Sequence, residues 1–213
     1  MCIMENLEQL TSKNLLQINA IIFNPANPFL WSSGWKSPIY CDNRKILSYP
    51  EIRKFLKESF ANSIKKYYPR AEVIAGVATG AIAIGALTAE ELDLPFVYVR
   101  SKSKGHGLEN MIEGDLKKGQ KVVVIEDLIS TGKSSLNAVH ALKEAGAEVL
   151  GMNAIFSYGF QIAIDNFKKA DCPVQTLTDY ETTIDIAVKE GYLKKDDINS
   201  LTKWRKDPTN WKK

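Results

Sequence analysis

The chain has 213 residues, within the range of a single domain, and its 45% hydrophobic and 25% charged residues are ordinary for a folded globular protein. A net charge of +3 is too small for a dedicated nucleic-acid binder, although it permits a local cationic site for an anionic substrate. Three scattered cysteines predict reduced thiols, and without a leader-like start or an apolar run of about 18 residues we expect a cytoplasmic protein with no membrane span.

The first third of the chain is predicted to contain two helices separated by a turn-rich segment. Leucine and isoleucine recur at helical spacing over about residues 5–23, and two Asn-Pro pairs end this pattern. Residues 29–44 contain Ser-Gly and Ser-Pro turn signals. An amphipathic helix is expected over residues 51–68, with Pro50 near its start.

After Pro69 the pattern changes to short apolar strands that alternate with helices. Strands are expected at residues 73–77, 96–99, 122–125, 149–156 and 174–177. Helices are expected at residues 81–92, 133–145 and 162–169 and again toward the C-terminus, and a polar loop at residues 100–118. This order predicts an α/β fold with a doubly wound, mostly parallel sheet flanked by helices, which binds ligands at the carboxyl ends of its strands.

The most informative segment is residues 122–134, with the sequence VVVIEDLISTGKS. A buried strand is expected to end in the adjacent carboxylates Glu126 and Asp127, and a helix to begin soon after them. Small hydroxyl residues and a glycine at a helix N-terminus present backbone N–H groups to a phosphate. Because carboxylates that faced this phosphate would repel it, we expect them to accept hydrogen bonds from neutral hydroxyls, as on a ribose.

Three other interpretations of these glycine-containing segments fit the sequence less well. An arbitrary acidic pair is more often a solvated strand end, but the whole string favours a sugar-phosphate site. The ending Thr-Gly-Lys-Ser imitates a nucleotide-binding P-loop, yet Asp127 occupies the place of the required first glycine. The turn at residues 76–80 is not a dinucleotide fingerprint, because Ala78 stands where the second glycine is needed.

Residues 122–134 resemble the phosphoribosyl diphosphate signature of type I phosphoribosyltransferases. The resemblance implies a single phosphoribosyltransferase domain over residues 1–213, in which Glu126 and Asp127 hold the ribose hydroxyls. It assigns the 5-phosphate to Ser130, Thr131, Gly132, Lys133 and Ser134. It also implies that the turn containing Thr79 and Gly80 binds the diphosphate.

Two further segments resemble orotate phosphoribosyltransferases within that family. Residues 98–107, YVRSKSKGHG, are similar to a mobile catalytic loop, here about residues 100–114, and residues 29–44 resemble part of an N-terminal hood of about residues 1–48. The loop residues implied to bind diphosphate are Arg100, Lys102, Lys104 and His106. Many relatives have lysine directly after the arginine, where this chain has Ser101 and places Lys102 one position later.

The hood resemblance also predicts the contacts of the base. Some members have a lysine in place of Ser32 that touches orotate, and this chain lacks it. An anionic substrate needs a cation, so Lys36 or Arg44 is expected to meet the orotate carboxylate, with Tyr40 near the ring and Ser130 beside the base. The hood tryptophans either pack the hood on the domain or contact the base.

The implied reaction is displacement at the anomeric carbon, in which orotate N1 attacks and diphosphate leaves to give orotidine 5'-monophosphate in pyrimidine (UMP) biosynthesis. The resemblance implies Mg²⁺ as cofactor, held by substrate oxygens and water with no protein ligand nominated. The catalytic residues that it implies are Lys104, His106, Arg100 and Asp127. It further implies a homodimer whose catalytic loop acts across the interface.

The sequence leaves two alternatives to an orotate phosphoribosyltransferase. A purine phosphoribosyltransferase would share the acidic motif but differ in the hood and in the loop at residues 100–107. A regulator of the same fold would bind nucleic acid and sense the diphosphate as an effector, but it would need a strong basic face or an added DNA-binding module. We therefore expect small-molecule substrates and neither a nucleic-acid nor a membrane partner.

Overall fold

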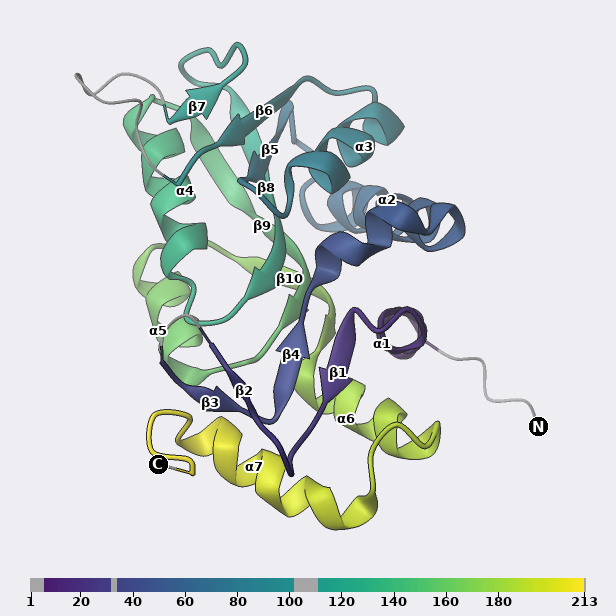
Figure 1. The fold of residues 1–213 in the computed structure, drawn as a ribbon. Coiled ribbons are helices and arrows are strands. Elements are labelled where there is room, and N and C mark those ends of the chain that lie inside the picture. Colours follow the sequence, from purple (N-terminus) through teal and green to yellow (C-terminus); the bar gives the residue numbers. More distant parts are fainter. Residues whose placement is uncertain (1–5, 32–33, 102–110, 213) are drawn as a thin grey trace.

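The computed structural model describes residues 6–31, 34–101 and 111–212, and its centre is a six-stranded sheet in the order β10-β9-β8-β5-β6-β7 (Figure 1). The strands are β5 (Val73–Val77), β6 (Phe96–Val99), β7 (Ile112–Glu113), β8 (Lys121–Ile129), β9 (Glu148–Ser157) and β10 (Val174–Asp179). All neighbouring strands are parallel except the edge pair β6 and β7. The predicted mostly parallel sheet is confirmed.

Helices cover both faces of this sheet, which explains why its central strands are apolar throughout. Alternate residues of β8 belong to two cores: Val122 and Val124 pack toward one face, and Val123 and Ile125 toward the other. The first face is covered by α4 (Lys133–Glu144) and α5 (Gln161–Lys169). The second is covered by α1 (Leu7–Gln17), α2 (Pro50–Tyr67), α3 (Ile82–Leu92), α6 (Tyr180–Lys189) and α7 (Ile198–Lys206).

The predicted hood of about residues 1–48 contains α1, two small two-stranded antiparallel sheets and a short helix. Strand β1 (Ile21–Phe23) pairs with β4 (Ile39–Cys41), β2 (Phe29–Leu30) pairs with β3 (Lys36–Ser37), and a 3-10 helix η1 spans Asn43–Ser48. In Figure 1 β2 and β3 lie near α5 and α7, whereas β1 lies beside α1. The side-chain amide of Asn43 donates to the backbone carbonyl of Asp127 at 2.6 Å and so ties the hood to β8.

Two N-terminal predictions need correction. The first helix ends at Gln17 instead of continuing to Phe23, because Asn19 adopts the left-handed conformation (φ 52°) and the chain then enters β1. The segment 29–44, predicted as turns, contains three short strands. Strands of two or three residues are too short to show a periodic pattern in the sequence.

Two corrections concern the sheet itself. The polar loop predicted over residues 100–118 contains the two-residue edge strand β7. The strand predicted to end at Ile125 continues to Ile129, because pairing with β9 persists through Leu128 opposite Phe156 and Ile129 opposite Ser157. Glu126 and Asp127 therefore lie within β8 and do not follow it.

Within the described ranges, none of the helices has the length and hydropathy of a membrane span.

Candidate active site

The two adjacent carboxylates of β8 reach different neighbours, as expected from the alternation of side chains along a strand. Glu126 is 4% exposed, and its Oε2 accepts a hydrogen bond of 2.7 Å from the Ser135 hydroxyl in α4. Its Oε1 accepts the backbone N–H of Asp127 at 3.0 Å. The Asp127 carboxyl lies instead against Gly80, in the turn between β5 and α3. Glu126 is thus held by the protein, while Asp127 faces the glycine turn.

Burial controls the protonation of this acidic pair. It raises the pKa of Glu126 well above the usual value, and the neighbouring Asp127 charge raises that pKa further. Burial also raises the pKa of Asp127, although hydrogen bonds and the nearby Arg44 charge oppose the effect. Two partly desolvated carboxyls at a strand end favour a ligand that supplies hydroxyl donors or a cation.

The turn after β5 brings a second predicted segment to the same corner. A Cβ added at Gly80 would lie 2.0 Å from Oδ2 of Asp127, so only glycine leaves room for that carboxyl. The peptide bond between Ala78 and Thr79 in this turn is cis. Segments that are almost 50 residues apart in the sequence, around Gly80 and Asp127, therefore meet at the carboxyl end of the sheet.

The predicted phosphate loop lies between β8 and α4. Gly132 has φ 78° and stands at the N-cap of α4, where no side chain caps the first turn. A Cβ at Gly132 would lie 2.8 Å from the Phe167 ring, and the Thr131 carbonyl accepts the Asn166 amide at 3.4 Å. Helix α5 thus supports the back of the loop, and the first backbone N–H groups of α4 have no side-chain cap that would compete with a phosphate.

A cavity of about 560 Å³ connects the hood with this loop. It is lined by Leu30, Trp31, Trp35, Tyr40, Cys41, Leu128, Ser130, Thr131 and Tyr158. Ser130 and Tyr40, both predicted to contact the base, thus share one pocket. Trp31 lines the pocket and packs on Tyr158, with ring centroids 5.0 Å apart, so it joins the hood to the domain, and its contact with the base stays a prediction.

Tyr158 and Leu128 were not predicted as site residues. Tyr158 directly follows β9, and its place at the carboxyl end of a central strand was the signal that could have identified it. Its side chain is 1% exposed, and its hydroxyl makes no hydrogen bond with any residue in the described ranges. Burial raises the pKa of Tyr158, so the hydroxyl stays protonated at neutral pH and available as a hydrogen-bond donor.

Neither cation predicted for the base lines this pocket. Arg44 is 58% exposed and makes a two-point contact with Asp42, from Nε at 2.7 Å and from Nη2 at 3.0 Å. The Lys36 side chain is exposed, while its backbone carbonyl accepts a hydrogen bond from Trp204 at 3.0 Å. The roles of Lys36 and Arg44 stay predictions.

The catalytic loop is described only at its two ends. Arg100 follows β6, its backbone N–H donates to the Met111 carbonyl at 2.7 Å, and its guanidinium lies 3.4 Å from Glu113. Arg100 therefore lies at the same carboxyl end of the parallel strands as Asp127, just after β6, the strand next to β5. Lys102, Lys104 and His106 lie outside the described residues, and their roles remain predictions.

Known proteins resemble this chain over nearly its full length. Residues 43–189 match the phosphoribosyl transferase domain family. The chain is 57% identical to the orotate phosphoribosyltransferase of Bacteroides thetaiotaomicron and 58% identical to that of Phocaeicola vulgatus, each over 98% of both chains.

Solved structures agree with this result. The orotate phosphoribosyltransferase of Aeropyrum pernix has a TM-score of 0.74 at 27% identity and covers 85% of this chain and 98% of that one. The UMP synthase of Leishmania donovani has a TM-score of 0.79 at 26% identity over 93% of this chain, which spans 43% of that longer protein.

The sheet order, the acidic strand end and the phosphate loop define a type I phosphoribosyltransferase, a pentosyltransferase by reaction class. The predicted fold and the predicted enzyme class are therefore both confirmed. The chain belongs to the orotate phosphoribosyltransferase family.

The buried Glu126 carboxyl predicts a pH-dependent stability. Its folded pKa is raised above its unfolded value of about 4.3, so the folded state binds more protons and its stability falls as the pH rises through the window above that value. Glu126→Gln removes this loss. The variant is expected to gain stability relative to the native chain between pH 5 and pH 8, as measured by urea unfolding at both pH values. Glu148→Gln, on an exposed residue, is the control.

Proposed function

We propose that this site transfers the 5-phosphoribosyl group of phosphoribosyl diphosphate to N1 of orotate, giving orotidine 5'-monophosphate and diphosphate. The observation that carries the proposal is that the cavity under the hood and the phosphate loop share Ser130 and Thr131. A planar base in this cavity and a sugar phosphate on the loop would thus be neighbours. Leu128 and the hood aromatics would hold the base, and Asp127 and Gly80 would lie beside the sugar.

Each part of the site has a distinct role in the proposed reaction. Residues 130–134 hold the 5-phosphate, and the turn with Thr79 and Gly80 holds the diphosphate. Asp127 and Glu126 bind ribose hydroxyls, and Asp127 stabilises the positive charge that develops on the ribose in the transition state. Arg100, Lys102, Lys104 and His106 stabilise the departing diphosphate. Catalysis is then mainly positioning and charge stabilisation.

Mg²⁺ is the proposed cofactor. The carboxyl end of β8 offers oxygen donors, which suit this cation, but no group of three or more His, Cys, Asp or Glu side chains in the described ranges could hold a metal ion. We therefore place the ion mainly on substrate oxygens and water beside Asp127. When bound, it adds positive charge at the leaving group.

The proposed assembly is a cytoplasmic homodimer in which the loop of about residues 100–114 acts at the partner's site. The hood of about residues 1–48 belongs to the same domain and covers the base. Sedimentation of the purified chain at micromolar concentration tests the dimer. A single species of monomer mass would overturn this part of the proposal.

Substrate tests decide the accepting base. The protein is incubated with phosphoribosyl diphosphate, Mg²⁺ and orotate, adenine, guanine or hypoxanthine, and each base is followed by absorbance. Orotate is expected to be consumed only when the diphosphate substrate is present. Consumption of a purine without consumption of orotate would instead identify a purine phosphoribosyltransferase.

Replacing Tyr158 by phenylalanine tests the base pocket. The hydroxyl is expected to donate to an oxygen of orotate, so its loss should raise the orotate KM about tenfold and leave the KM for phosphoribosyl diphosphate unchanged. Tyr180→Phe is the matched control: its hydroxyl donates to the Leu201 carbonyl at 3.1 Å, away from the cavity. That variant should lose stability but keep the orotate KM. Equal orotate KM values in native enzyme and Tyr158→Phe would remove Tyr158 from base recognition.

The cation for the orotate carboxylate is tested separately. Lys36→Ala or Arg44→Ala is expected to raise the orotate KM. Binding of uracil, which lacks the carboxylate, should be the same in the variant and in the native chain. Arg44 must leave Asp42 to reach the base, so Asp42→Asn should free it and lower that KM if Arg44 is the cation. If orotate binds Lys36→Ala and Arg44→Ala as it binds the native chain, neither residue fills this role.

A further inference from the structure

The cavity under the hood is lined by distant parts of the chain. Besides the end of β8 and the phosphate loop, the hood provides one wall through Trp31, Trp35 and Tyr40, and the segment after β9 provides another through Tyr158. Tyr158 sits in a three-residue connection between β9 and α5, where Gly159 has φ 62°. Strand β9 ends at Ser157, so pairing with the neighbouring strands does not fix the carbonyls of Tyr158 and Gly159.

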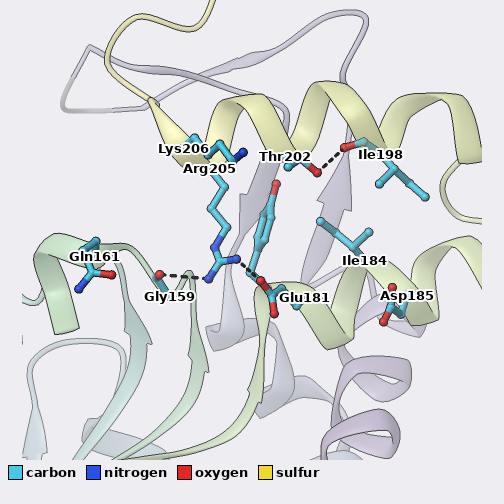
Figure 2. Close-up of a pocket in the computed structure, with 10 residues that line it drawn as sticks. Gly159, Gln161, Glu181, Ile184, Asp185, Ile198, Thr202, Arg205 and Lys206 are labelled. Atoms are coloured by element: carbon cyan, nitrogen blue, oxygen red, sulfur yellow. Dashed lines mark hydrogen bonds and ion pairs between the residues drawn. The ribbon is translucent and has the colours of Figure 1, made fainter.

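Arg205 of α7 holds this connection. Its Nε donates to the Tyr158 carbonyl and its Nη2 to the Gly159 carbonyl, each at 3.2 Å. Figure 2 shows the guanidinium reaching from α7 to Gly159 and Glu181, across a groove of about 560 Å³ between α6 and α7. The ion pair with Glu181 and the Tyr180 ring, 5.8 Å from the guanidinium carbon, fix the Arg205 side chain in turn.

The same turn of α7 also holds the hood. The Trp204 indole N–H donates to the Lys36 carbonyl in β3 at 3.0 Å. The buried Trp204 ring lies 5.6 Å from Trp31 and 5.7 Å from Tyr158, measured between ring centroids. Two consecutive residues of the C-terminal helix thus contact both of these walls of the cavity, although neither lines it.

We infer that Arg205 is a positioning residue for base binding, which acts by holding the Tyr158–Gly159 backbone so that the Tyr158 side chain keeps its place in the cavity wall. This inference rests on the proposed base pocket. The planar guanidinium suits the task because it can donate to two carbonyls and a carboxylate at once, whereas a lysine ammonium has no fixed fork. A Cβ at Gly159 would lie 2.8 Å from the Arg205 Nη2, so the contact is close.

Steady-state kinetics of the full chain test the inference. Arg205→Gln is expected to raise the orotate KM about tenfold, with kcat and the KM for phosphoribosyl diphosphate within about twofold of the native values. Arg205→Lys keeps the charge beside Glu181 and should restore little of the orotate affinity. Lys206→Gln is the control, because Lys206 is the next residue, is exposed, and its side chain has no hydrogen bond or ion pair with the described residues.

Each outcome decides for or against the positioning role. A lower melting temperature with both KM values unchanged would mean that Arg205 only stabilises the fold, and would overturn the inference. If Arg205→Gln does not fold, Arg205→Lys decides, and a native orotate KM in that variant overturns it equally. If the orotate KM rises in Tyr158→Phe but stays native in the Arg205 variants, Arg205 has no positioning role while Tyr158 keeps its role in base binding. An unchanged orotate KM in Tyr158→Phe removes the Tyr158 hydroxyl from base recognition, whereas failure to consume orotate counts against the base pocket itself.

Discussion

Gly80→Ala is expected to lower kcat/KM for phosphoribosyl diphosphate by about 10²-fold, because a displacement of about 1 Å at a reacting centre has an effect of that size. The new Cβ would lie 2.0 Å from Oδ2 and 2.3 Å from Cγ of Asp127, so the carboxyl must move. The Asp127 backbone cannot follow easily, since its carbonyl accepts the Asn43 amide and β8 pairs with β9 on either side of it. Steady-state kinetics with varied phosphoribosyl diphosphate would measure the effect.

A second glycine provides the matched control for this prediction. Gly119 has φ 85°, and a Cβ there would meet no atom within 4 Å. Gly119→Ala should therefore lose stability through backbone strain while its kinetic constants stay native. Native kcat/KM in a folded Gly80→Ala variant would show that the position of Asp127 does not limit the reaction.

Lys104→Ala is expected to lower kcat by about 10²–10³-fold, the usual effect of removing one well-placed group that stabilises transition-state charge. This prediction rests on the sequence of the loop, because Lys104 lies outside the described residues. Steady-state rates with both substrates saturating would measure it. Lys117→Ala, an exposed lysine beyond β7, is the control and should keep the native rate.

Mixing two inactive variants tests whether the loop acts across a dimer interface. A Lys104→Ala subunit retains the corner around Asp127, and an Asp127→Asn subunit retains the loop. If the loop serves the partner's site, a mixed dimer contains one site with both parts intact and activity returns. If activity does not return although mixed dimers form, the loop serves its own subunit.

Elements that depend on a local pattern could be predicted from the amino-acid sequence alone. The strands at residues 73–77 and 96–99 have the predicted bounds, because a short apolar run between turn signals is the local mark of a buried strand. The acidic pair and the phosphate loop could be identified for a similar reason: their chemistry resides in one continuous segment, residues 122–134. The family was identified from this segment together with the loop and hood sequences.

The contacts between distant residues could be seen only once the chain was folded. No local pattern relates Gly80 to Asp127, or Arg205 to Tyr158, because these contacts depend on how helices and loops pack on the finished sheet. The extension of β8 beyond Ile125 likewise depends on its partner β9. Periodicity records whether a residue is buried, whereas the identity of its neighbours is set by the packing of segments far apart in the chain.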